Sequence, residues 1–219
     1  MTYKDLYLQK NRGYFVGNAR YEIIKQIPNN KHNKVLELGC GDGATLLELK
    51  KINKASFVAG IDIMDFQQDN CLDKFTLADI EVIDDLPFPK EYFDVIICAD
   101  VLEHLKDPWE ATKKVVWYLK KDGIFIASIP NIREIKTLYD LIINNDFKYV
   151  EAGILDKTHL RFFCKKNMID LFNSSDLKIK NILRIPNTLS KKRILLNFIS
   201  FGLFREFFVT QYLIIGIKK

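Results

Sequence analysis

One segment constrains the fold of this chain more than any other: Lys34–Lys50, which reads KVLELGCGDGATLLELK. It predicts a buried strand, a tight turn with glycines at 39, 41 and 43, and then an amphipathic helix. Such a turn lets backbone N–H groups approach a ligand, and the helix N-terminus adds partial positive charge. Glu37, just before the turn, disfavours a pyrophosphate and suits a ligand with an ammonium group. The alternative is a strand-to-helix turn that binds nothing.

Composition places this turn in a single α/β domain. The chain has 219 residues, 48% of them hydrophobic, enough to bury one core. Its net charge of +5 neither demands nor excludes nucleic acid. The cysteines, at 40, 71, 98 and 164, lack metal-binding spacing and are expected to be reduced. The N-terminus has no signal-peptide core, and the apolar stretch Ile194–Phe204 is too short to span a bilayer, so we expect a soluble, cytoplasmic protein.

Strands and helices alternate along the sequence. A first helix is expected around Ala19–Ile27, another that opens at Asp107 and Pro108 and runs to about Leu119, and a third over Lys165–Asn173. Apolar runs predict strands at Val35–Leu38, Phe57–Ile63, Phe75–Ala78, Phe93–Ala99, Ile124–Ile129, Leu177–Ile185 and Gln211–Ile217. This alternation favours a doubly wound sheet with helices on both faces and a ligand at the carboxyl ends of the strands.

Acidic residues follow three further strands in order: Asp62 after the second, Asp79 after the third and Asp100 after the fourth. Together with the glycine turn they resemble the class I S-adenosylmethionine-dependent methyltransferases over about Lys34–Asn131. The resemblance implies a Rossmann-like, seven-stranded sheet whose last strand is antiparallel. It also implies one methyltransferase domain over 1–219, with an N-terminal helical cover (1–33), a cofactor-binding core (34–131), and a substrate cover with the C-terminal strands (132–219).

The same resemblance implies the cofactor, S-adenosylmethionine, its product S-adenosylhomocysteine, and the residues that contact them. Arg20 has an alternative role as a solvated helix residue. The implied contacts are Tyr14, Arg20, Glu37, Gly39, Cys40, Gly41, Asp62, Ile63, Asp79, Ile80, Ala99 and Asp100.

Three later segments indicate which branch of this family the chain resembles: DVLEHLKDPW, GIFIASIPNIR and GILDKTHLRFFCKKNMIDLF. They resemble a small bacterial group linked to glycosyltransferases and surface-glycan assembly, and DVLEH also resembles the ring O-methyltransferases of quinone synthesis. The resemblance implies O-methylation of a sugar in a glycan precursor or of a small hydroxyl compound. The alternatives are an RNA 2′-O-methyltransferase, although Lys191–Arg193 is the one dense basic cluster, and a non-catalytic regulator that binds S-adenosylmethionine.

An oxygen acceptor needs a base, and histidine suits this near neutral pH. His104 follows the fourth strand at the ligand edge, whereas His159 lies in the segment expected to cover that edge, where a structural role is the alternative. His32 is expected at the surface. Glu103 and Asn131 are predicted to bind substrate, and Asn131 could instead cap the next helix.

A divalent cation is the second hypothesis for this site. Asp100, Glu103, His104 and His159 are similar to the Glu-x-x-Glu-His pattern by which some O-methyltransferases hold a cation that activates a hydroxyl. The alternative is that Glu103 and His104 contact the substrate directly.

One segment, Asn187–Arg205, has no match. We expect a lid or a packing helix there. The alternative is an interfacial helix that touches a membrane bearing a lipid-linked acceptor.

Overall fold

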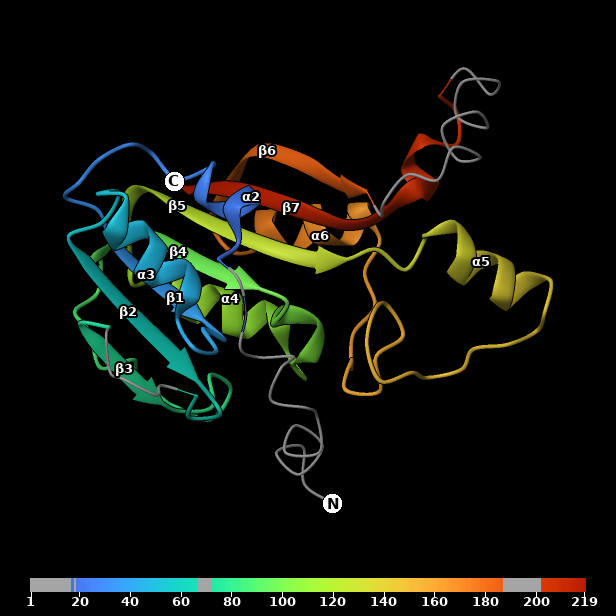
Figure 1. Ribbon diagram of the computed structural model, residues 1–219, viewed down its shortest axis with the longest axis horizontal. Coiled ribbons are helices and arrows are strands. Elements are labelled where there is room, and N and C mark those ends of the chain that lie inside the picture. The colour runs from blue at the N-terminus through green and yellow to red at the C-terminus, as the bar shows by residue number, and fades with distance from the viewer. Residues whose placement is uncertain (1–16, 18, 67–71, 187–201) are drawn as a thin grey trace.

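The computed structural model describes residues 17, 19–66, 72–186 and 202–219 (Figure 1). Tyr14 and most of the unmatched segment after Pro186 therefore lie outside the described residues. The described strands form a seven-stranded sheet in the order β3-β2-β1-β4-β5-β7-β6. Their bounds are β1 (Lys34–Leu38), β2 (Phe57–Asp62), β3 (Lys74–Leu77), β4 (Phe93–Ala99), β5 (Leu119–Pro130), β6 (Leu177–Pro186) and β7 (Val209–Lys218).

Strand directions confirm the predicted fold class. The first five strands run parallel, and β7 runs antiparallel to both of its neighbours, β5 and β6. The sequence order therefore reverses between β1 and β4, where a doubly wound sheet opens a crevice at the carboxyl ends of its strands.

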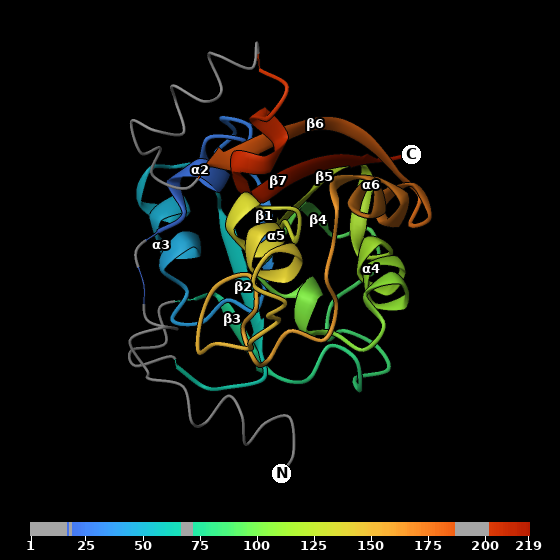
Figure 2. The same cartoon turned by 90° about the vertical axis from the view of Figure 1, so that its right-hand side faces the viewer.

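Helices cover both faces of this sheet, as Figure 2 shows with α2 and α3 on one side and α4 and α6 on the other. The α-helices are α2 (Tyr21–Ile24), α3 (Ala44–Lys51), α4 (Pro108–Val116), α5 (Ile135–Ile142) and α6 (Lys165–Asn173), and the 3-10 turns are η2 (Leu102–His104) and η3 (Arg205–Phe208). None of the described helices is long and apolar enough to cross a membrane.

The two cores follow from the alternation of side chains along each buried strand. Val35 and Val95 pack in the core beneath α2 and α3, whereas Leu36 and Ile96 pack in the core beneath α4 and α6. Successive residues point to opposite faces of a strand, so an almost continuous apolar run is what a parallel sheet covered on both sides requires.

Several predicted boundaries were wrong, among them the end of α4 and the start of β5, which begins at Leu119 and not at Ile124. The helix α4 begins after Asp107, whose side chain accepts a hydrogen bond from the backbone N–H of Glu110 at 3.0 Å, but it ends at Val116 and not near Leu119. The buried ring of Tyr118 ends the helix, because its hydroxyl reaches Asp85 at 2.8 Å while its backbone C=O accepts from Tyr92. The strand β5 starts directly afterwards.

The helix α5 was not assigned from the sequence. It follows β5 and projects beyond the carboxyl edge of the sheet, to the right in Figure 1. The chain then returns through residues 143–164 to α6, passing over the edge where the predicted site residues lie.

Candidate functional site

A single cavity of about 480 Å³ collects most of the predicted site residues at the crevice between β1 and β4. This volume lies within the range of small-molecule sites, about 300–1,000 Å³. The glycine turn and the ends of β2 and β3 line one part. The ends of β4 and β5, the start of β7 and the loop around His159 line the rest. The two groups of predicted residues therefore share one space.

The glycine turn is shaped by backbone that other residues adopt with strain. Gly39 has φ +63, and a Cβ built on it would lie 2.4 Å from a methyl carbon of Val101. Gly43, with φ +79, stands at the N-cap position of α3. The N–H of Gly39 donates to the C=O of Ile61 at 2.8 Å, which fixes the turn against the end of β2. Only glycine meets these conditions without cost.

Asp62, predicted to bind a ribose, accepts hydrogen bonds from the N–H groups of Gly41 at 2.8 Å and Met64 at 2.9 Å. It thus ties the end of β2 to the glycine turn, and burial raises the pKa of its carboxyl. Asp79, after β3, accepts from the N–H of Glu81 at 2.9 Å. Both residues line the cavity, as their predicted role requires.

Glu37 brings a buried acid to the same cavity. Its side-chain oxygen Oε2 has no hydrogen-bond partner among the described residues. Burial raises the pKa of Glu37 to about 8, although the positive charge of Arg20 opposes the shift. A buried acid without a full set of partners is costly unless a ligand completes it. Its environment fits the positively charged group that the sequence predicted.

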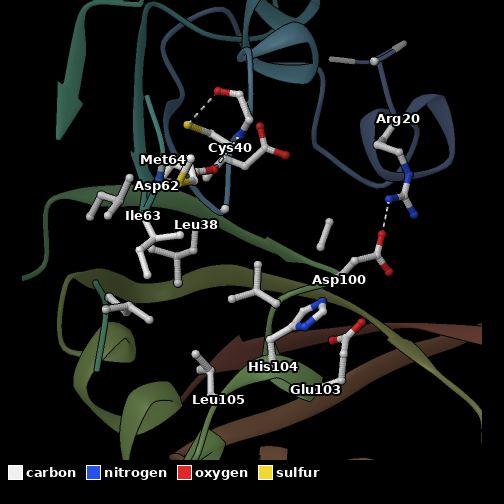
Figure 3. A pocket seen from close by; sticks show the side chains of 18 of the residues that line it. Arg20, Leu38, Cys40, Asp62, Ile63, Met64, Asp100, Glu103, His104 and Leu105 are labelled. Carbon is white, nitrogen blue, oxygen red and sulfur yellow. Dashed lines mark hydrogen bonds and ion pairs between the residues drawn. The ribbon is translucent and has the colours of Figure 1, made fainter. Parts of the chain in front are cut away.

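Arg20 reaches across the cavity to Asp100 (Figure 3), so it is not a solvated helix residue. Its Nη1 lies 2.5 Å from Oδ2 of Asp100, and its Nη2 donates to the hydroxyl of Ser128 at 3.3 Å. The side-chain amide of Gln211, on β7, donates to the other Asp100 oxygen. Asp100 itself adopts φ +57, an uncommon value for a non-glycine residue. Residues from both ends of the chain thus hold this carboxylate.

Beyond Asp100 lie Glu103, His104 and His159. The imidazole nitrogen Nδ1 of His104 lies 3.0 Å from the C=O of Thr158, and Nδ1 of His159 lies 2.9 Å from the C=O of Ile154. A carbonyl can only accept, so each Nδ1 carries a proton and Nε2 is the basic nitrogen of the neutral ring. The two rings lie 4.7 Å apart and meet edge to face at 70°.

Glu103 completes this cluster. It is 1% exposed, and neither of its side-chain oxygens has a hydrogen-bond partner among the described residues. Its Oε1 lies 4.0 Å from Nε2 of His159, too far for a hydrogen bond but close enough for one atom to bridge them. Burial, reinforced by the negative charge of Asp100, holds the pKa of Glu103 well above its usual range.

The loop that carries His159 is held by residues that the sequence analysis missed. The side chain of Asp156, fully buried, accepts from the N–H of Thr158 at 2.8 Å and from its hydroxyl at 2.7 Å. The C=O of Glu103 accepts from the N–H groups of Leu160 and Arg161 at 2.8 and 2.9 Å. The cover loop and Glu103 are therefore joined. The Asp-x-Thr spacing is a local turn signal that could have been recognised, whereas nothing local identifies Gln211.

The predicted cofactor contacts that line the cavity are Arg20, Glu37, Gly39, Cys40, Gly41, Asp62, Ile63, Asp79, Ile80, Ala99 and Asp100, and the predicted acid–base and substrate residues that do so are Glu103, His104 and His159. Tyr14 lies outside the described residues. Lining the cavity is compatible with these roles, which stay predictions.

Asn131 is not among the lining residues. Its side-chain amide donates to the C=O of Val209 at 2.8 Å, and its Oδ1 accepts from the N–H of Arg133 at 3.2 Å. It is 1% exposed and fastens the end of β5 to the start of β7. This geometry gives no support to substrate binding by Asn131. It does not cap α5 either, because the side chain of Glu134 does so.

Of the four predicted metal ligands, only three lie close together. One ligand atom each from Glu103, His104 and His159 lies within 4.8 Å of the others. Asp100 does not belong to this group, because Arg20 and Gln211 hold its two oxygens. The hypothesis of a four-residue set was therefore wrong at Asp100, whereas the other three residues do come together.

Comparison with known proteins assigns the chain that forms this cavity to a family. A family model described as a methyltransferase domain matches residues 9–181 of the chain. The chain belongs to the methyltransferase domain family. A relative from Shewanella sp. (strain ANA-3), a ubiquinone biosynthesis O-methyltransferase, is 26% identical to this methyltransferase over 163 residues. That match covers 69% of the chain and 66% of the relative, so the chain spans about two thirds of that relative's length.

Two further comparisons give a second relative and a solved structure with a similar fold. A fibrillarin-like rRNA/tRNA 2′-O-methyltransferase from Methanococcus vannielii is 27% identical over 166 residues, 70% of the chain and 71% of the relative. The crystal structure of a SAM-dependent methyltransferase from Archaeoglobus fulgidus superimposes with a TM-score of 0.64 and covers 90% of this chain and 92% of that one. At 21% identity, this structural similarity supports the fold alone. The family, the methyl donor S-adenosylmethionine and the product S-adenosylhomocysteine predicted for this methyltransferase are confirmed.

Proposed function

We propose that this methyltransferase methylates a hydroxyl oxygen of a small molecule, with a sugar of a glycan precursor as the first acceptor class to test. The observation that carries the proposal is the cluster of Glu103, His104 and His159, which lies in the same cavity as the predicted cofactor residues. A hydroxyl acceptor must lose its proton, and two imidazoles with basic Nε2 atoms supply the means. The relatives from Shewanella and Methanococcus are both named as O-methyltransferases.

S-adenosylmethionine, when bound, supplies an electrophilic methyl group on a sulfonium. The chain's own contribution begins with positioning, since methyl transfer depends strongly on alignment of the acceptor oxygen. Glu37 faces the cofactor part of the cavity and Asp62 closes the turn beside it. In methyl transfer the O–CH₃ bond would form as the C–S bond of the donor breaks, which would yield S-adenosylhomocysteine, and the hydroxyl proton would pass to Nε2 of His104 or His159.

Variants of the two histidines test this assignment and identify the base. His104→Gln and His159→Gln are assayed with S-adenosylmethionine against sugars, phenols and catechols. Loss of a general base lowers kcat by about 10²–10⁴-fold, and only the true base also removes the fall in rate at low pH. Thr210→Ser, a mild change elsewhere in the cavity wall, is the control. Full activity in both histidine variants would overturn the acid–base role, and failure of every hydroxyl acceptor would overturn O-methylation.

A divalent cation at the cluster is the second candidate, favoured by the buried oxygens of Glu103, which have no hydrogen-bond partner in the part of the chain that the structure describes. Glu103, His104 and His159 would hold it, and the carbonyls that fix Nδ1 of each ring orient both imidazoles as metal ligands usually are. Such a cation lowers the pKa of a bound hydroxyl. Equilibrium dialysis with Mg²⁺ and Mn²⁺, and turnover in chelator, distinguish the two routes. Metal-independent turnover would exclude this one.

The RNA alternative derives its support from the fibrillarin-like relative. It requires RNA affinity that falls steeply with salt. A filter-binding assay with a short RNA at low and high salt tests it, and a lack of binding at low salt removes it. Turnover with any acceptor would exclude the alternative of a non-catalytic regulator.

A further inference from the structure

Large apolar side chains are exposed together at one end of the molecule. They come from α5, from the loop that follows it, and from residues just before η3, and Figures 1 and 2 both place α5 and η3 at this end. We call this set the apolar end. It consists of Tyr139, Leu141, Ile142, Ile143, Phe147, Tyr149, Val150, Leu160, Leu203 and Phe204. More than half of the exposed large apolar side chains of the described residues lie here, and such a concentration marks a contact surface.

The helix α5 exposes part of its apolar stripe. Ile135, Leu138, Tyr139 and Ile142 have the spacing of one helix face, yet Tyr139 is 54% and Ile142 is 71% exposed. The buried residue of the helix is Thr137. A surface helix of a globular protein normally shows the reverse arrangement. The stripe therefore has no sufficient partner among the described residues.

The charges around the apolar end are mainly basic. Between residues 133 and 165 and between 202 and 208, ion pairs join Lys136 to Asp140, Lys157 to Glu151, and Lys165 to Glu206. The remaining exposed charged side chains of these ranges are Arg133, Lys148, Arg161 and Arg205 on the basic side, against Asp146 on the acidic side. This rim is complementary to an anionic surface.

We propose that the apolar end docks on the surface of a bilayer that contains anionic lipids. Its side chains come from separate segments, and α5 projects beyond the sheet in Figure 1, so a fluid partner that needs no matching shape suits them. Aromatic and aliphatic side chains with a basic rim are the composition of an interfacial anchor. Ile154 and His159, from the same cover loop, line the cavity, so docking turns the site toward the bilayer.

Flotation with vesicles tests this. The wild-type chain is mixed with vesicles of phosphatidylcholine alone or with phosphatidylglycerol, and is expected to float with the anionic vesicles and to be released by salt. The triple variant Tyr139→Ser, Ile142→Ser, Leu203→Ser is expected to lower the partition coefficient about tenfold or more. Trp117→Ser is the matched control, since Trp117 is 57% exposed and lies before β5, at the opposite edge of the sheet. Lys148→Glu with Arg205→Glu tests the rim without touching the apolar side chains.

Each outcome decides the proposal. No flotation of the wild-type chain, equal flotation of the triple variant, or equal loss in Trp117→Ser would overturn it. If sedimentation velocity shows self-association that the triple variant abolishes, and vesicles do not bind, the surface belongs to a second copy of the chain. Calorimetry with S-adenosylhomocysteine checks that every variant keeps a folded cofactor site. The result is independent of the acceptor, so failure here leaves the proposed O-methylation standing.

Discussion

Two glutamates, Glu37 and Glu103, are buried titratable groups in the wall of the cavity. Both have raised pKa values because burial disfavours their charged forms, and the effect is stronger at Glu103, where the charge of Asp100 adds to it. Each glutamate is suited to a different partner, since Glu37 lies beside the glycine turn whereas Glu103 lies beside two imidazoles. The same residue type is therefore predicted to contact the cofactor in one place and the substrate in the other.

Glu37 makes the stability of the cofactor-free protein depend on pH. An unfolded glutamate loses its proton near pH 4.3, whereas the folded Glu37 holds its proton up to about pH 8. The folded state binds more protons between these values, so the free energy of unfolding falls as pH rises through this window. We expect a loss of up to about 1.4 kcal/mol per pH unit relative to Glu37→Gln, which lacks the titration.

Urea unfolding from pH 5 to 8 measures this difference. Glu110→Gln, at an exposed position of α4, is the control and should follow the wild type. Parallel curves for wild type and Glu37→Gln would show that the acid is ionised in the folded state. Cofactor binding near pH 7 should also release a proton in the wild type and not in the variant.

At the scale of elements, β2 and the glycine turn are in tight contact. A Cβ at Gly60 would lie 2.4 Å from Sγ of Cys40 and 3.0 Å from a methyl carbon of Leu72. Gly60→Ala should therefore destabilise the fold by about 1–3 kcal/mol and weaken cofactor binding, because Cys40 lines the cavity. Adding Cys40→Ala removes the closest clash and should restore part of both losses. Urea unfolding and calorimetry report them, and a double variant as impaired as Gly60→Ala would contradict this account.

The helix α4 depends on its N-cap. Asp107→Ala removes the acceptor for the N–H of Glu110 and should cost about 1 kcal/mol of stability. Asp107→Asn keeps an acceptor oxygen and should be nearly neutral, so the pair separates capping from helix propensity. Chemical unfolding at pH 7 gives both values, and equal losses would assign the effect to the negative charge.

The elements that the sequence predicted well are those with local signals. The strand β4 and the helix α6 have the predicted bounds, because an apolar run and a polar flank define each. The helix α5 was missed although Ile135, Leu138, Tyr139 and Ile142 have the spacing of one helix face, a local signal that could have been recognised. The end of α4 depended on Tyr118 and its distant partner Asp85, which no local pattern reveals.

The site shows the same division. Motif residues such as Asp62 and Asp79 follow strands directly, so their position in the cavity could be predicted. The bonds that Arg20 and Gln211 make to Asp100 join residues 80 and 111 positions apart, and these depend on the strand order. In that order β7 lies beside β5. Asn131, which was predicted to bind substrate, instead joins these two strands through its hydrogen bond to the C=O of Val209.

For the whole molecule, ligand binding should appear as added stability. A ligand that binds only the folded state at 100 times its Kd adds about 2.7 kcal/mol. At this chain length we expect S-adenosylhomocysteine to raise Tm by about 5–10 °C. Differential scanning fluorimetry measures the shift, with Asp62→Ala as the variant that should lose most of it. An unchanged Tm at saturating ligand would refute the cofactor assignment for this cavity.

The position of β7 between β5 and β6 also dictates an order of events during synthesis. All of β6 leaves the ribosome before any of β7, yet β6 bonds to the sheet only through β7. Until then the growing chain carries β5, whose side chains are largely buried in the finished sheet, with one edge open to other chains. Chaperone binding to nascent chains should therefore persist until residues 209–218 have emerged.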